Sequence, residues 1–201
     1  GRWPHLMDKR IKSFEKMRDM ARKKSNKGNF DLAYIKSVDF YKNLGKRALK
    51  VMESSQYMEI CMLTEEEKIF CHHDYTYHNI VMDKENNVNI IDFDYCKKEV
   101  RVYDISAFMI KVLKRLDWNI EYAKLIIDTY NEISPLKAEE YRVLFAYLLF
   151  PQRFWRLANR FYYNEVNWAQ TTFVNKVEEL IEEQEKYMKF IEEFKNLYEQ
   201  K

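Results

Sequence analysis

The sequence predicts a mainly helical fold of the α+β class with one small sheet, and three observations lead to that prediction. The 201 residues include only three glycines and three prolines, so long helices should dominate over hairpins and tight turns. Apolar residues recur at helical spacing over most of the chain. Between residues 68 and 94 that spacing gives way to short segments rich in β-branched residues, which indicate strands.

Length and composition favour one compact domain. With 47% hydrophobic and 16% aromatic residues the chain can bury a core, so we predict a single domain over residues 1–201. The 33% of charged residues nearly cancel, to a net charge of +2, which gives no electrostatic reason to expect a nucleic-acid partner. No apolar run reaches membrane-spanning length and no secretory signal is visible, so we expect no membrane partner and synthesis in a reducing cytoplasm.

The three cysteines show no pairing pattern. Cys61, Cys71 and Cys96 are odd in number and contain no C-x-x-C pair. We therefore expect no disulfide framework, and small buried side chains at Cys71 and Cys96.

Two long helices are predicted before residue 54, over residues 6–21 and 31–53, with the polar segment 25–29 between them. Their inward faces carry apolar residues at helical spacing, namely Met7, Ile11, Phe14, Met17 and Ala21 in the first helix and Ile35, Val38, Tyr41, Ala48 and Met52 in the second. Nine Lys and Arg residues lie between Lys9 and Lys27. They form either a solvated face, which we favour, or an anion site.

The region of residues 68–94 predicts the only sheet of the chain. Residues 68–74 fit a short buried strand that runs into a loop. Residues 79–83 and 88–94 fit two strands of a hairpin, joined by the polar turn 84–87.

Helices return after the hairpin. We predict helices near residues 104–116, 119–131, 137–150 and 152–163, and one long helix over 168–199. Pro135 and Pro151 fall at helix boundaries, because proline is excluded from helix interiors. The long helix carries an apolar stripe that fits core packing or, as the alternative, an oligomer seam: Val174, Val177, Ile181, Met188, Ile191 and Tyr198.

The polar residues around the predicted hairpin form the most informative pattern. His72 and Asp74 begin an H-x-D-x-x-x-x-N string that ends at Asn79, and Asp92 follows at the end of the next strand. Phosphoryl transfer uses a carboxylate beside the acceptor hydroxyl and oxygen ligands that hold Mg²⁺ against the phosphates. We therefore interpret the string as a phosphotransferase site rather than as a set of turn residues.

This string resembles the catalytic and metal-binding segments of aminoglycoside and choline kinases. The resemblance implies the C-terminal lobe of the protein-kinase-like fold, with helices around a small β-hairpin that carries the catalytic loop. It also implies that Asp74 is the catalytic base and that Asn79 and Asp92 are the Mg²⁺ ligands. His72 and Asp104 are then expected to support the loop, with Asp104 as the N-cap of the following helix.

Two positions depart from protein kinases. Position 73 is His, where protein kinases have the Arg that engages a phosphorylated activation loop. No such loop follows, so regulated protein kinase activity is not expected. Asp94 replaces the glycine of a D-F-G motif, and it either shares a second metal ion or caps the following segment.

Three longer segments resemble the CotS family of spore coat proteins: CHHDYTYHNI, IDFDYCKKEVRVYDIS and FPQRFWRLANRFYY. The likeness runs from the first predicted helix to the last. It implies localisation in the spore coat, with other coat proteins or a small-molecule substrate as partners. In the third segment Arg153, Arg156 and Arg160 share one helix face, where they contact an anionic substrate or are neutralised by acidic neighbours.

Proteins of that kind begin with an N-terminal nucleotide-binding lobe, and no segment before Lys68 carries its glycine loop or its strand lysine. Because the chain also starts without Met, we expect it to be the C-terminal lobe of a longer parent, with the missing N-terminal lobe as a partner. Mg²⁺ and ATP are the cofactors expected for that parent. The fold of this chain needs neither, no nucleotide-binding residue is assigned in it, and we expect the isolated chain to be inactive.

Three functions agree with these features. In the first, the parent transfers phosphate from ATP to a small hydroxyl compound or a coat component. In the second, the protein is a non-catalytic scaffold of the spore coat that keeps a kinase-like fold. In the third, it is a small-molecule kinase with no role in spores.

Overall fold

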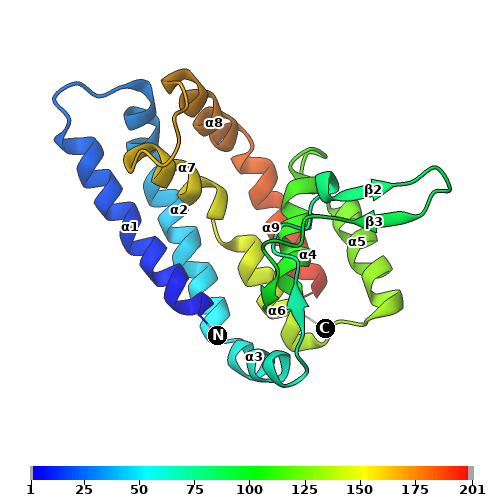
Figure 1. The fold of residues 1–201 in the computed structure, drawn as a ribbon. Helices are drawn as coiled ribbons and strands as arrows, with labels where there is room; N and C mark the ends of the chain where they lie inside the picture. Colours follow the sequence, from blue (N-terminus) through cyan, green and yellow to red (C-terminus); the bar gives the residue numbers. More distant parts are fainter. Residues whose placement is uncertain (1, 199–201) are drawn as a thin grey trace. The chain divides into compact units, whose positions relative to one another are not determined.

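The computed structural model describes residues 2–198 and consists mainly of helices with two small antiparallel sheets (Figure 1). The prediction of a mainly helical α+β fold is therefore confirmed. The described chain forms two compact units. One contains residues 51–148 and 190–198, and the other contains residues 2–50 and 149–189.

The helices and strands have the following bounds in chain order. The first part contains α1 (Trp3–Lys23), α2 (Asn29–Glu53) and α3 (Tyr57–Glu66). The central part contains β1 (Phe70–Cys71), the 3₁₀ helix η1 (Tyr77–Asn79), β2 (Ile80–Met82), β3 (Val88–Ile90) and β4 (Lys97–Lys98). The last part contains α4 (Val102–Leu113), α5 (Ile120–Ile133), α6 (Ala138–Leu149), α7 (Gln152–Tyr162), α8 (Gln170–Glu182) and α9 (Gln184–Tyr198).

An aromatic core holds the unit of residues 2–50 and 149–189 together, where α7 packs against α1 and α8. Tyr34 is fully buried, donates its hydroxyl to the Phe14 carbonyl at 3.0 Å and stacks on Phe154 with ring centroids 5.4 Å apart. The predicted inward face of the first helix is buried throughout. In α2, Val38, Tyr41, Ala48 and Met52 are buried as predicted, and Ile35 is partly exposed.

Gly45 allows α1 and α2 to approach closely. A Cβ atom at this position would lie 3.0 Å from Cγ1 of Ile11, which is tighter than ordinary van der Waals contact. A larger residue at position 45 would therefore push the two helices apart.

The other unit buries a second aromatic cluster. Phe145 of α6 stacks near Phe194 of α9, and Tyr141 stacks on Tyr198 with ring centroids 5.2 Å apart. Such ring pairs add stabilisation beyond the apolar area that they bury. These contacts anchor the end of α9 to α6.

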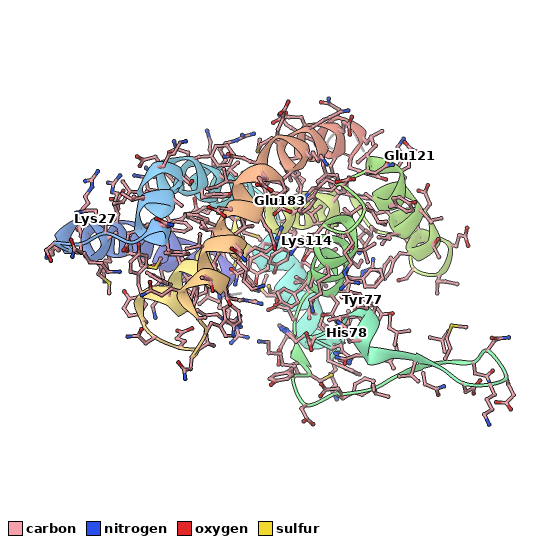
Figure 2. All side chains as sticks on the ribbon, turned by 90° about the horizontal axis from the view of Figure 1, so that it is seen from above. Lys27, Tyr77, His78, Lys114, Glu121 and Glu183 are labelled. Carbon is pink, nitrogen blue, oxygen red and sulfur yellow. The ribbon has the colours of Figure 1, made fainter. Side chains whose placement is uncertain are left out.

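The β2–β3 hairpin projects from the helices of its unit, as Figures 1 and 2 show. The strands are antiparallel, with Ile80 paired to Ile90 and Met82 paired to Val88. Asp83 holds the turn because its Oδ1 accepts hydrogen bonds from the backbone N–H groups of residues 85 and 87. The predicted hairpin and its polar turn are confirmed.

Two elements of this region were not predicted. The helix α3 lies between the second predicted helix and the first strand, and a second sheet pairs β1 with β4, Phe70 opposite Lys98. The predicted buried strand is only half right, because Cys71 is buried while Phe70 is 63% exposed.

The prediction of one long helix over residues 168–199 was wrong. The segment forms α8 and α9, which are separated by Glu183 in a turn. The apolar stripe changes with this break: Val177, Ile191 and Tyr198 are buried as predicted, while Val174, Ile181 and Met188 are only partly covered. The four shorter helices predicted before it match α4 to α7, and Pro135 and Pro151 lie between helices.

Within residues 2–198, no helix combines the length and the apolar character needed to cross a lipid bilayer.

Candidate active site

The loop between β1 and β2 brings Asp74 and Asn79 into direct contact. The side-chain amide of Asn79 donates to the Asp74 carbonyl at 2.9 Å and to Asp74 Oδ2 at 3.3 Å. Thr76 caps the short helix η1 by accepting from the N–H of His78 at 3.1 Å. Asn79 is buried, and both hydrogen bonds of its side chain come from the amide nitrogen.

The carboxylate of Asp104 holds the start of this loop from helix α4. Its two oxygens accept the backbone N–H groups of His72 at 2.6 Å and His73 at 3.0 Å. Burial raises the pKa of Asp104, and the two backbone hydrogen bonds oppose that rise in part. Asp104 lies in the first turn of α4 and is not its N-cap, which is Arg101. The predicted capping role was wrong, because the carboxylate is used by the loop instead.

The ring of His72 connects the loop to the segment that precedes Asp92. Nδ1 accepts the backbone N–H of Asp74 at 3.3 Å, and Nε2 lies 2.9 Å from the carbonyl of Ile91. Because Nδ1 is an acceptor, the proton of the neutral ring must be on Nε2, where it is donated to Ile91. The buried His72 therefore links the positions of Asp74 and Asp92.

The hairpin ladder brings Asn79 next to Asp92. The backbone carbonyl of Asn79 accepts the N–H of Ile91 at 3.0 Å, and this bond extends the β2–β3 pairing by one residue pair. Asp92 follows directly, with a φ of 65°, a left-handed conformation that is rare outside glycine. His73 is also left-handed, with a φ of 66°, and such strained residues concentrate at functional sites.

A lysine that the sequence patterns did not single out completes the cluster. The Nζ atom of Lys111, on α4, lies 3.0 Å from Asp74 Oδ1, with side chains that are 39% and 43% exposed. Lys111 lies 37 residues after Asp74, and no spacing rule connects the two positions. Only the packing of α4 behind the loop brings them together.

The oxygen atoms at this site fit Mg²⁺ better than a transition metal. The described residues contain no group of three or more His, Cys, Asp and Glu that could hold a metal ion. Mg²⁺ needs fewer protein ligands, because it keeps several waters and takes phosphate oxygens. The carboxamide oxygen of Asn79 and the exposed carboxylate of Asp92 are oxygen groups of the type that Mg²⁺ prefers.

Cys71 lies beside the loop but is not reactive. Its Sγ donates to the carbonyls of Glu99 and Val100, each at 3.4 Å, and burial raises the pKa of the thiol. The thiol is therefore protonated at neutral pH and serves the packing of β1.

The three arginines of α7 have different surroundings. Arg153 forms an ion pair with Glu183. Arg156 is exposed, and the guanidinium of Arg160 lies 5.3 Å from the ring centre of Trp168. The acidic-neighbour alternative thus describes Arg153, and Arg160 remains available to an anion.

Comparisons with known proteins give one relative in sequence and one neighbour in fold. The chain is 23% identical over 175 residues to Spore coat protein S of Bacillus subtilis (strain 168), a match that covers 84% of this chain and 48% of that protein. Its fold is similar to the crystal structure of an aminoglycoside phosphotransferase from Alicyclobacillus acidocaldarius subsp. acidocaldarius DSM 446, with a TM-score of 0.90 and 20% identity. That similarity covers 100% of this chain and 60% of the other. The chain therefore spans about half the length of the curated relative that it matches.

A family model adds the decisive match. The model described as "Spore coat putative kinase YutH" matches residues 1–194, which is nearly the whole chain. The chain belongs to this family of spore coat kinase-like proteins.

Proposed function

We propose that this chain is the C-terminal lobe of a kinase-like phosphotransferase of the spore coat. The observation that carries the proposal is the hydrogen-bonded cluster of Asp74, Asn79, His72 and Asp104. Asp92 directly follows Ile91, whose N–H bonds to the backbone carbonyl of Asn79. The lobe that binds nucleotide is proposed to lie outside these 201 residues, in a longer parent that carries this chain.

In the proposed reaction Asp74 acts on the acceptor. Its half-exposed carboxylate orients the acceptor hydroxyl and takes the proton as the oxygen attacks the terminal phosphorus of ATP. A new P–O bond forms at the acceptor while the bond to ADP breaks. The acceptor is a small hydroxyl compound or a coat component.

Asn79 and Asp92 are the proposed metal ligands. When bound, Mg²⁺ neutralises charge on the phosphate oxygens of ATP. The amide nitrogen of Asn79 is used by Asp74, which turns the amide oxygen away from that contact and makes it available. The left-handed backbone at Asp92 is in line with the proposal, because strained residues concentrate at functional sites.

One contact favours a second function. Lys111 pairs with the carboxylate of Asp74, so this carboxylate has a partner without any substrate. A scaffold of the spore coat that performs no chemistry would use Asp74 and Asn79 only to close the loop. The two functions differ in whether Asp74 is needed for phosphate transfer.

Phosphate transfer from radiolabelled ATP, measured with the parent protein and a spore coat extract as acceptor, tests the proposal. We expect Mg²⁺-dependent transfer that Asp74→Asn lowers by about 100-fold or more, the scale of a lost general base. Asp128→Asn, which alters an exposed carboxylate on α5, is the matched control and should retain activity. Equal transfer by both variants, or none by the parent, would favour the scaffold.

Calorimetric titration of MgATP shows whether nucleotide binding needs the part of the parent that lies outside residues 1–201. We expect binding to the parent and little binding to residues 1–201 alone. Absence of binding to both would contradict the proposed kinase.

A further inference from the structure

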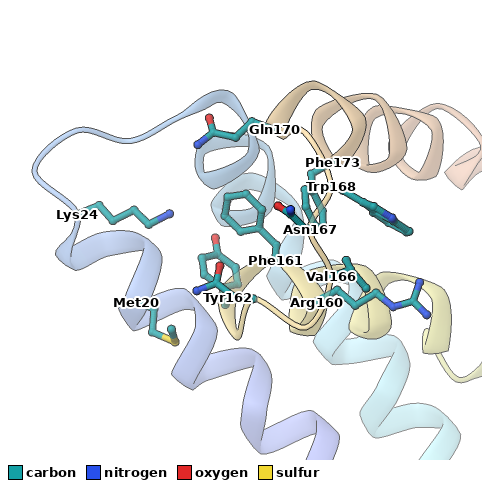
Figure 3. Close-up of a pocket in the computed structure, with 11 residues that line it drawn as sticks. Met20, Lys24, Arg160, Phe161, Tyr162, Val166, Asn167, Trp168, Gln170 and Phe173 are labelled. Carbon is teal, nitrogen blue, oxygen red and sulfur yellow. The ribbon is translucent and has the colours of Figure 1, made fainter.

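A pocket of about 800 Å³ opens in the unit of residues 2–50 and 149–189 (Figure 3). It lies where the C-terminal ends of α1 and α7 meet the segment that leads into α8. Its walls come from residues 20–24 and 160–173, and none of them belongs to the cluster of Asp74, Asn79 and Asp92. No role has been assigned to it so far.

The lining of this pocket is positively charged. Lys24 and Arg160 line it, and the lining includes no Asp or Glu. The buried Asp31 pairs with Lys24 at 2.8 Å, which holds the lysine in place and partly balances its charge. No carboxylate within residues 2–198 pairs with Arg160, whose guanidinium lies 5.3 Å from the ring centre of Trp168.

The start of α8 adds to the positive charge around the pocket. Its N-cap, Ala169, offers no side-chain hydrogen bond to the first turn, and the first turn holds no acidic residue. The N-terminus of a helix carries a partial positive charge and free N–H groups. Gln170, the first residue of α8, lines the pocket, so the helix end lies at its wall.

Aromatic rings form two other parts of the wall. Trp168 is 37% exposed, and Phe161 lies with its ring 4.7 Å from the Lys24 ammonium. The buried Phe173 contacts both rings, with centroid distances of 5.3 Å to Trp168 and 5.1 Å to Phe161. The two rings are therefore fixed from behind and present surface to the pocket.

Three carboxamides complete the lining: Asn164, Asn167 and Gln170. All three residues are exposed, and each amide group offers both a donor and an acceptor. Hydroxyl groups also donate and accept at once, so they match carboxamides better than apolar or purely anionic groups do. The edges of this pocket therefore suit a ligand rich in hydroxyls.

We propose that this pocket binds an anionic saccharide, that is, a sugar ring that carries a carboxylate or a phosphate. The C–H face of the ring packs on Trp168 or Phe161, and its hydroxyls bond to the carboxamides. The acidic group pairs with Arg160 through charge-assisted hydrogen bonds. An inorganic anion has no ring face for Trp168 or Phe161 to contact. A polycationic amino sugar is repelled by the lining, which has no carboxylate.

Nuclear magnetic resonance titration of the full chain with a charge series tests the proposal. The probes are glucosamine, glucose, glucuronate and glucose 6-phosphate, which share the ring and differ in charge, with inorganic phosphate as the ring-free anion. We expect glucuronate or glucose 6-phosphate to shift the Trp168 indole signal at concentrations where glucose and glucosamine do not. Whichever of the two acidic sugars binds more tightly identifies the acidic group.

Matched variants locate the site. Arg160→Gln should weaken binding of the acidic sugar by about tenfold, as expected for one charge-assisted contact, and should leave the weak response to glucose unchanged. Trp168→Ala should weaken the acidic sugar and glucose alike. Arg156→Gln, on the same helix but outside the pocket lining, is the control and should bind as the unmodified chain does.

Three results would overturn the proposal. One is an absence of any shift at Trp168 with either acidic sugar. Another is equal weakening by Arg156→Gln and Arg160→Gln, which would indicate a general charge effect. The third is binding of inorganic phosphate as tight as that of glucose 6-phosphate, which would leave an anion site with no role for the sugar. None of these readouts involves nucleotide, so the result is independent of the proposed phosphotransfer.

Discussion

The ammonium of Lys111 lies 3.0 Å from the carboxylate oxygen Oδ1 of Asp74. The contact joins helix α4 to the loop that carries the proposed catalytic base. In the proposed reaction it provides a cation where negative charge concentrates. It also gives Asp74 a partner in the absence of substrate.

Replacing Lys111 with Met should separate stability from activity. The pair is partly exposed, so the free energy of unfolding should change by no more than about 1 kcal/mol. Phosphate transfer by the parent should fall by about tenfold or more, since a charged contact at the reacting centre is lost. Lys124→Met removes the exposed pair with Glu121 and is the control for both measurements. Equal activity of the two variants would show that Lys111 has no part in the reaction.

Replacing Asp104 with Ala should loosen the loop. The backbone N–H groups of His72 and His73 lose their acceptor, which should lower the free energy of unfolding by about 2–4 kcal/mol. Asp104→Asn keeps one acceptor oxygen and should cost about half as much. Urea unfolding gives the free energies, and amide hydrogen exchange at His72 and His73 gives the local effect. A change below about 0.5 kcal/mol for the alanine variant would contradict the bracing role.

The ion pair of Arg101 and Glu140 should make stability fall in acid. Both nitrogens of the pair, Nε and Nη2, lie 2.7 Å from the carboxylate oxygens. Burial raises the pKa of Glu140, but the hydrogen bonds from Arg101 and from the backbone of Lys137, with the charge of Arg101, outweigh it and hold the pKa below 4.5. The ionised form is therefore favoured by folding, so this contribution is present above pH 4.5 and is lost as the pH falls through the lowered pKa.

Glu140→Gln tests that pH dependence. The variant leaves Arg101 half-paired, so at pH 7 it should be less stable by about 3 kcal/mol. The difference from the unmodified chain should shrink as the pH falls below 4.5, because both then lack the charged carboxylate. A difference that stays constant over that interval would show that Glu140 does not titrate as described.

The thiol of Cys71 should react only after unfolding. It is 3% exposed and its pKa is raised by burial, whereas Cys61 and Cys96 are partly exposed. A thiol reagent added to the native chain should label at most these two residues rapidly, and the third in step with unfolding. Mass spectrometry of the labelled peptides identifies them. Rapid labelling of Cys71 in the native chain would contradict its packed position.

The long helices were predictable because one strong pattern determines each of them. In α1 the residues at helical spacing are the ones that are buried. In α3 the pattern is obscured, since Met58, Met62 and Leu63 are exposed and break the stripe. The missed helix is therefore one whose apolar residues do not share a face.

Other elements depend on partners distant in sequence. Lys97 and Lys98 form β4 only because β1 pairs with them, and lysine has little preference for strands. The break at Glu183 was also missed, because the backbone there stays in the right-handed helical region, with φ −77° and ψ −7°. No proline or glycine marks that position.

The candidate site also combines local patterns with contacts between residues that are distant in sequence. Asp74, Asn79 and Asp92 were identified from their spacing along one hairpin, which is a local pattern. Lys111 contacts Asp74 through the packing of a separate helix, a relationship that requires the tertiary structure. Asp104 was expected both to support the loop and to cap α4, and the structure shows the loop contact without the cap.

The central claim is that Asn79 and Asp92 hold a divalent cation beside Asp74. Titration of the isotopically labelled chain with Mn²⁺, a paramagnetic substitute for Mg²⁺, tests it directly by nuclear magnetic resonance. We expect the side-chain amide of Asn79 and the backbone signals of Ile91 and Asp92 to broaden first, and Asp92→Asn to abolish that preference. Broadening spread evenly over exposed carboxylates, and unchanged by Asp92→Asn, would contradict the claim.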